Sequence, residues 1–183
     1  MMSRRFRAFA IALLACAGLG PALAQSSALK GHNSNAPVDV AADRIEVQDH
    51  ADRAIFSGNV VVKQAEMTMT AARLTVAYSR NKSDRDSTTG KVQIERLDAS
   101  GGVTVTSPSE RAVGNFGIYD LRKKIVTLIG DVTLTRSDGH VSGQRLTIDL
   151  DSGRAVMDGG GAPGTSSSGG RVTGTFTVPQ KKG

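Results

Sequence analysis

The chain has 183 residues, of which 39% are hydrophobic and 4% aromatic, and 23 basic against 17 acidic residues give a formal net charge of +6. Its single cysteine excludes an internal disulfide, and the chain has no tryptophan. The mild positive charge, without a basic block interleaved with aromatic residues, argues against a nucleic-acid partner. The length suits one domain.

The first residues have the pattern of a secretory signal peptide. A basic start precedes a short apolar run, and Ala22–Ala24 supplies small residues before a cleavage point after residue 24. The apolar run is too short to cross a bilayer, so we expect a cleaved protein released into the periplasm. Cys16 follows a small residue and leaves a lipoprotein signal as an alternative. The expected organisation is a signal peptide over 1–24, a flexible segment over 25–36, one domain over 37–178 and a tail over 179–183.

The rest of the chain repeats one strand-like unit. A glycine that precedes an alternating run recurs at Gly58, Gly101, Gly130 and Gly159, and the last three are 29 residues apart. The first interval is longer because it contains the polar stretch Ser79–Lys91. This stretch predicts a long hairpin inserted in one repeat.

The hydrophobic residues of each unit alternate with polar ones, as in "GNVVV" and "LTVAY". Valine and threonine are frequent, and Gly-Asn and Gly-Asp pairs separate the runs, so the sequence predicts an all-β chain. The inward parity slips by one residue at Thr70–Arg73 and in other units, which predicts a bulge or corner that keeps both halves of each strand facing one interior. Such corners would bend the sheet into a trough.

The expected interior is aliphatic and of medium size. Its predicted members are Val38, Val40, Ile45, Val47, Phe56, Val60, Val62, Met67, Met69, Leu74, Val76, Val103, Val105, Tyr119, Leu128, Val132, Leu134, Val141, Leu146 and Ile148. These side chains could pack against each other, or they could line a slot that a ligand fills. Periodicity alone does not separate the two interpretations.

Four stretches together resemble the OstA-like family. They are Pro37–Val47 ("PVDVAADRIEV"), Phe56–Val62 ("FSGNVVV"), Ala112–Leu134 and Ser142–Leu150 ("SGQRLTIDL"). The similarity extends over about Ala36–Val178. It implies an open antiparallel β-jellyroll whose hydrophobic interior holds the acyl chains of lipopolysaccharide (its lipid A part), with no cofactor and no catalysis.

The resemblance also implies a periplasmic bridge built by head-to-tail stacking. It would run from an LptC-like partner anchored in the inner membrane to an LptD-like partner in the outer membrane. We place the LptC-like contact at the N-terminal edge, Val38–Ala42, and the LptD-like contact at the C-terminal edge, Arg171–Val178. Strand addition there would satisfy unpaired backbone groups and would also build a homo-oligomer.

The residues expected to contact lipid come from the predicted interior. They are Val38, Val40, Ile45, Val47, Phe56, Val60, Val62, Met69, Leu74, Val76, Val103, Val105, Tyr119, Leu128, Val132, Leu134, Leu146 and Ile148. Each acyl methylene removed from water is worth about 0.8 kcal/mol, so partial burial of several chains would hold a lipid without any catalytic group. For a carrier of this kind we expect part of the lining to stay vacant until lipid fills it.

Few residues suggest other chemistry. His32, His50 and His140 lack metal-ligand spacing and are expected at the surface. The glycine-rich stretch at 159–164 matches a nucleotide-binding pattern only in its glycines, because Pro163 interrupts it and no helix follows. No catalytic or metal site is predicted.

Three arginines, Arg44, Arg73 and Arg145, precede aliphatic triplets beside the expected corners. They could meet lipid phosphates, but we favour a role in capping turns or pairing with nearby acids. Two other functions stay open. One is a related protein of another lipid or assembly route, such as an anchored adaptor. The other is a secreted β-solenoid that binds or cleaves polysaccharide, although cleavage needs paired carboxylates and the inward rows are apolar.

Overall fold

The computed structural model describes residues 32–80, 92–160 and 170–177. The predicted signal peptide with Cys16, most of the predicted hairpin, the centre of the glycine- and serine-rich stretch and the C-terminal tail lie outside these residues. The domain boundaries therefore stay predictions.

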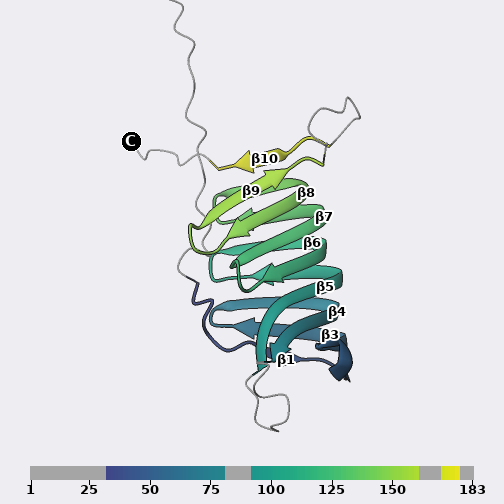
Figure 1. The fold of residues 1–183 in the computed structure, drawn as a ribbon. Helices are drawn as coiled ribbons and strands as arrows, with labels where there is room; N and C mark the ends of the chain where they lie inside the picture. Colours follow the sequence, from purple (N-terminus) through teal and green to yellow (C-terminus); the bar gives the residue numbers. More distant parts are fainter. Residues whose placement is uncertain (1–31, 81–91, 161–169, 178–183) are drawn as a thin grey trace, which may run out of the picture.

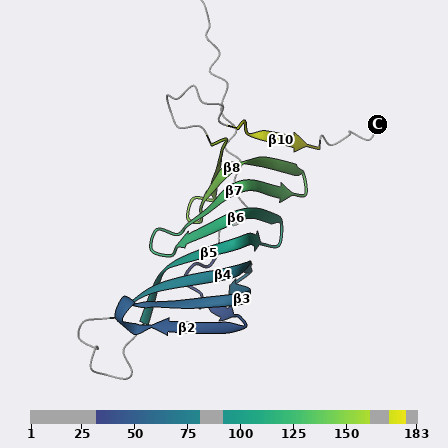
Figure 2. The same ribbon diagram turned by 90° about the vertical axis from the view of Figure 1, so that its right-hand side faces the viewer.

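The described chain is almost entirely β-structure, as predicted. The strands are β1 (Asp39–Ala41), β2 (Arg44–Gln48), β3 (Arg53–Gln64), β4 (Met67–Arg80), β5 (Val92–Thr106), β6 (Glu110–Asp120), β7 (Ile125–Arg136), β8 (Gly139–Asp149), β9 (Arg154–Asp158) and β10 (Thr173–Phe176), with one short 3-10 turn, η1 (Asp49–Ala51). All pairings are antiparallel, and each long strand pairs with the next along the chain. Figures 1 and 2 show these strands lying one above the other along the length of the molecule. No described helix is long and apolar enough to span a membrane.

Each long strand contributes to two walls, because a break in register divides it. Wall A contains β1, β10 and the segments 60–64, 67–71, 103–106, 110–114, 132–136 and 139–143. Wall B contains β2, β9 and the segments 53–57, 73–80, 92–100, 116–120, 125–129 and 145–149. The bend predicted at Thr70–Arg73 is among these breaks. At the bend, β3, β5 and β7 each have two residues opposite one residue of β4, β6 and β8. The inward parity therefore shifts by one residue in β4, β6 and β8 but not in β3, β5 and β7, and both halves of every strand face the interior.

The repeated glycines mark these bends. Gly58, Gly101 and Gly130 have φ values of 79°, 83° and 82°, in the left-handed region that suits glycine. The strand bounds place them within β3, β5 and β7, so the interpretation that they open strands is wrong. A Cβ added to Gly101 would lie 2.6 Å from the Cβ of Ala72 on β4, so the bend also needs the missing side chain.

The sheet does not close, and both walls end in edge strands. Wall A runs from β1 to β10, whereas β2 and β9 pair only with β3 and β8 in wall B. The edges predicted at Val38–Ala42 and Arg171–Val178 thus contain β1 and β10, with Val178 outside the described residues. An open sheet exposes unpaired N–H and C=O groups along such edges.

Candidate functional site

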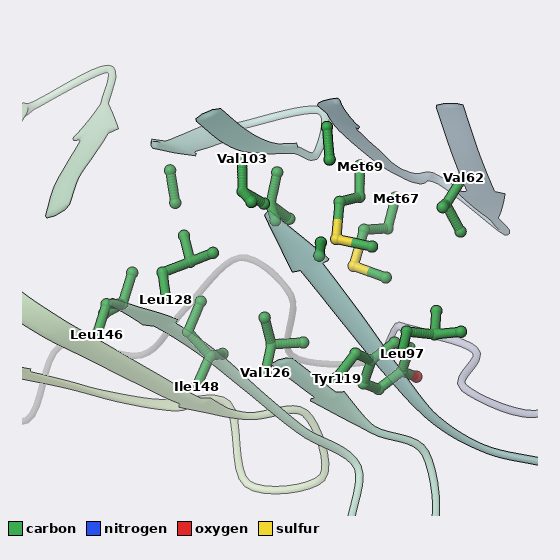
Figure 3. Close-up of a cluster of buried hydrophobic side chains, with 14 of the residues drawn as sticks. Val62, Met67, Met69, Leu97, Val103, Tyr119, Val126, Leu128, Leu146 and Ile148 are labelled. Carbon is green, nitrogen blue, oxygen red and sulfur yellow. The ribbon is translucent and has the colours of Figure 1, made fainter. Parts of the chain in front are cut away.

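The inner faces of the two walls meet in one apolar interior. Figure 3 shows Val62, Met67, Met69 and Val103 of wall A opposite side chains of wall B such as Leu128. Ile148 of wall B lies beside Val105 and Leu134 of wall A. The interior is therefore lined by medium-sized aliphatic residues along the whole stack.

Most residues predicted to contact lipid belong to this interior. The buried ones, at most 6% exposed, are Val60, Val62, Met69, Leu74, Val76, Val103, Val105, Tyr119, Leu128, Val132, Leu134, Leu146 and Ile148. Val38, Val40 and Phe56 are partly buried against them. The alternation in the sequence thus identified the inward face, but contact with lipid stays a prediction.

Ile45 and Val47 differ from the prediction, because they are 55% and 56% exposed. Their partners on β3 are Phe56 and Ala54, so register places both side chains on the inner face of wall B. They stay uncovered because β2 is the last strand of this wall, where the interior opens to solvent. Both are inner-facing residues of the open end and not of the packed interior.

Several interior residues were missed. Leu97, Ala99, Val126 and Leu150 are at most 4% exposed, and each continues an alternation that the sequence contains. Gln64 is the polar case: it follows Val60 and Val62 with inward parity, and it is 2% exposed. Its position in the inward alternation was the sequence signal that could have identified Gln64 as a buried polar residue.

The interior leaves no room for an acyl chain at one position between the walls. A cavity between Val105, Leu134 and Ile148 has a volume of about 10 Å³, space for about one water molecule. The expected partial vacancy is therefore wrong at this position, because medium-sized side chains from opposite walls interdigitate and fill the space. A guest could enter here only if the walls moved apart.

Two polar contacts lie where the inner faces meet the turns. The Tyr119 hydroxyl donates to Gln64 Oε1 at 2.9 Å. Burial raises the pKa of Tyr119 to about 12, although its hydrogen bond to Gln64 acts in the opposite direction. In wall A, Arg136 Nε donates to Glu110 Oε2 at 3.0 Å, and the Glu110 side chain is only 3% exposed. These contacts neutralise or satisfy polar groups that face an apolar space.

The other candidate residues have surface roles. Arg44 lies 3.8 Å from Glu46 at an exposed site, as favoured, whereas Arg73 and Arg145 form no ion pair with any described residue. His50 and His140 are exposed, but His32 Nε2 lies 3.1 Å from Gln64 Oε1, so its expected role as a free surface group is wrong. No group of potential metal ligands occurs within residues 32–80, 92–160 and 170–177.

The two bent walls and their aliphatic interior define an open antiparallel β-jellyroll, as the resemblance implied. The antiparallel pairing contradicts the alternative of a solenoid with stacked parallel rungs. A family model described as "LptA/(LptD N-terminal domain) LPS transport protein" matches residues 39–154. The chain belongs to this family of lipopolysaccharide transport proteins.

Two relatives extend this finding. An uncharacterized protein of Rhizobium meliloti (strain 1021) is 32% identical over 158 residues, 80% of this chain and 84% of the relative. LptH of Pseudomonas aeruginosa, described as the LptA homologous periplasmic component of the conserved lipopolysaccharide transport device, has a similar crystal structure. The TM-score is 0.64 at 19% identity, over 80% of this chain and 99% of that chain. The likeness to LptH shows a shared fold.

Proposed function

We propose that this protein is a non-catalytic periplasmic carrier that holds the acyl chains of lipopolysaccharide between its walls and passes the lipid from the inner to the outer membrane. The observation that carries this proposal is the mainly aliphatic inner face that runs through six successive long strands in a member of a lipopolysaccharide transport family. The predicted signal peptide supports the periplasmic location.

The inner side chains of the described residues are buried against each other. A lipid can therefore bind only if contacts between these side chains are replaced by contacts with its acyl chains. The walls are continuous at the bends, so they can part on the opposite side without breaking a strand. Acyl methylenes would then replace contacts between side chains such as Leu128 and Val103, with about 0.8 kcal/mol for each methylene removed from water. Similar linings at successive repeats would give similar energies along the stack, which favours movement of the lipid.

The open ends support the head-to-tail assembly. Ile45 and Val47 lie exposed at the β2 end, and Val172 and Phe176 are 43% and 50% exposed at the β10 end. Strand addition to β1 and β10 would cover such ends and pair their free backbone groups. We assign the β1 end to an LptC-like partner and the β10 end to an LptD-like partner, with further copies of the chain between them.

Nothing in the interior favours catalysis. Cleavage of a glycosidic bond needs two carboxyl groups about 5–10 Å apart. Glu110 is the one acidic residue among the buried described side chains, and it is paired with Arg136. A carrier function therefore accounts for the site better than a hydrolase.

Native mass spectrometry of the purified protein with lipopolysaccharide tests the proposal. We expect a bound lipid A species in the wild type and its loss in Leu134→Asp, which places a charge on the inner face. The control is Thr133→Asp, one residue away on the outer face, which should keep the lipid. Equal binding by both folded variants would contradict a lipid site between the walls.

A further inference from the structure

Gln64, at the end of β3, is a buried side chain with all its hydrogen-bonding capacity in use. A glutamine amide has two N–H donors and a carbonyl oxygen with two lone pairs. Gln64 Nε2 donates to the carbonyl oxygens of Ser34 and Ala36, both at 3.0 Å. Gln64 Oε1 accepts from the Tyr119 hydroxyl at 2.9 Å and lies 3.1 Å from His32 Nε2. Because this oxygen only accepts, His32 Nε2 must be the donor.

These four bonds join three parts of the molecule. Gln64 belongs to wall A and Tyr119 to wall B, and β4 and β5 separate their strands within the sheet. The bond between the two side chains therefore crosses the interior. The other three bonds hold residues 32–38, which we call the strap, and Val38 of the strap packs partly against the core. The strap is the dark segment that leads into β1 in Figure 1.

A pocket of about 390 Å³ lies between the strap and wall B. The lining is mixed. Val38 of the strap, Val92 and Ile94 of β5, and Leu121 after β6 form its apolar part, and Gln64 forms part of its boundary. Polar groups of Ser34, Asn35, Gln93 and Arg122 lie around this apolar part. Val92 is 54% exposed, so an apolar surface is already open to solvent here. The volume falls within the roughly 300–1,000 Å³ of ordinary ligand pockets, unlike the cavity deeper between the walls.

We propose that this pocket is where an acyl chain of the lipid first binds, and that the strap is a gate which must leave Gln64 before the chain enters the interior. The inference rests on the proposed lipid-binding function. It explains why a packed interior and a carrier role coexist: Gln64 holds both walls and the strap together, so its release frees the side of the jellyroll opposite the bends. No other described glutamine is similarly buried.

The test compares Gln64→Leu with the wild type and with Gln144→Leu, which replaces an exposed glutamine bonded to Asp131. Hydrogen exchange of the strap and stopped-flow association of lipopolysaccharide are the two measurements. For Gln64→Leu we expect faster exchange at 32–38 and association roughly ten- to a hundredfold faster, because three strap bonds are lost. Gln144→Leu should change neither, and saturating lipopolysaccharide should accelerate strap exchange in the wild type.

A second variant covers the case in which Gln64→Leu does not fold. Gln64→Glu keeps the size and the acceptor oxygen but loses both donations to the strap, so it should also accelerate exchange and association. Two results would contradict the gate but not the carrier function. One is faster hydrogen exchange of the strap in the variants without faster association of lipopolysaccharide. The other is unchanged hydrogen exchange of the wild-type strap when the protein is saturated with lipopolysaccharide. Failure of every chain, wild type included, to bind lipopolysaccharide would overturn both.

Discussion

At the residue scale, exposure separates two kinds of inner-facing side chain. Leu128 is fully buried where the walls meet, whereas Ile45 lies on the same inner surface but is 55% exposed at the open end. Burial contributes to stability in the first case, whereas the second side chain contributes little until something covers it. Aliphatic side chains of the inner surface therefore stabilise the fold where the walls meet and are available for contact with a partner at the open end.

This difference predicts unequal effects of truncation on stability. Leu128→Ala should lower the free energy of unfolding by about 2–5 kcal/mol, because it leaves a cavity in a packed core. Ile45→Ala should change it by no more than about 0.5 kcal/mol, as expected for an exposed position. Urea unfolding followed by circular dichroism measures both. Similar losses in the two variants would show that the walls do not pack as described.

Tyr119 predicts a specific pH dependence. Its pKa in the folded protein is about 12, above the ordinary value of 10.0, so the unfolded chain loses this proton first. The free energy of unfolding should be unaffected by this group below about pH 10 and should fall as the pH rises from about 10 to 12. Tyr119→Phe should remove this part of the fall, whereas Tyr78→Phe should retain it. Parallel curves for the wild type and Tyr119→Phe would contradict the assignment.

At the element scale, the 29-residue repeat consists of two strands, each bent once, and the turns that follow them. One of these turns has the same hydrogen bond in successive repeats: Leu121 N donates to Glu95 O at 3.0 Å, and Leu150 N donates to Lys124 O at 2.9 Å. Asp120 and Asp149 precede these leucines, and backbone N–H groups of the turns lower the pKa of both carboxyls. The Asp-Leu pair that occurs at 120–121 and again at 149–150 therefore marks the turn at the end of a strand.

The bends can be tested with adjacent glycines. Gly101 and Gly102 have φ values of 83° and 78°, but an added Cβ meets Ala72 only at Gly101 and finds nothing within 4 Å at Gly102. Gly102→Ala should cost about 1–2 kcal/mol from backbone conformation alone. Gly101→Ala should cost more, and Ala72→Gly should recover the difference in the double variant. Thermal unfolding measures all three, and equal losses without recovery would contradict the contact.

The sequence predicted the periodic features and failed where three-dimensional proximity decides. Inward parity identified Val103 and Leu146, and the slip of parity predicted the bends. The position of a glycine within a strand could not be read, because a left-handed bend and a strand start have the same local composition. The contacts of Gln64 with the strap and with Tyr119 join residues 28 to 55 positions apart in the sequence, and no local sequence pattern predicts them.

At the scale of the whole molecule, the jellyroll is a stack with two unlike ends. Phe176 pairs with Gly139, which places it on the same face as Leu134, at the β10 end. Phe116 is similarly exposed, but it lies on the outer face of wall B. An assembly through the ends should depend on the first phenylalanine and not on the second.

Analytical ultracentrifugation over a range of concentrations tests this difference. Phe176→Glu should weaken self-association, because it places a charge in the apolar end that a second copy would cover. Phe116→Glu makes the same change at a site 55% exposed, against 50% for Phe176, and should leave self-association unchanged. Loss of association in Phe116→Glu alone would place the contact on wall B.

Photo-crosslinking in cells can detect lipopolysaccharide acyl chains in the space between the walls. A benzophenone amino acid is placed at the inner positions 69 and 134 and, as matched controls, at the outer positions 68 and 133. We predict crosslinks to lipopolysaccharide from 69 and 134 and none from 68 and 133. Crosslinks of equal yield from the outer positions, or none from the inner ones while the protein is folded and exported, would contradict the account.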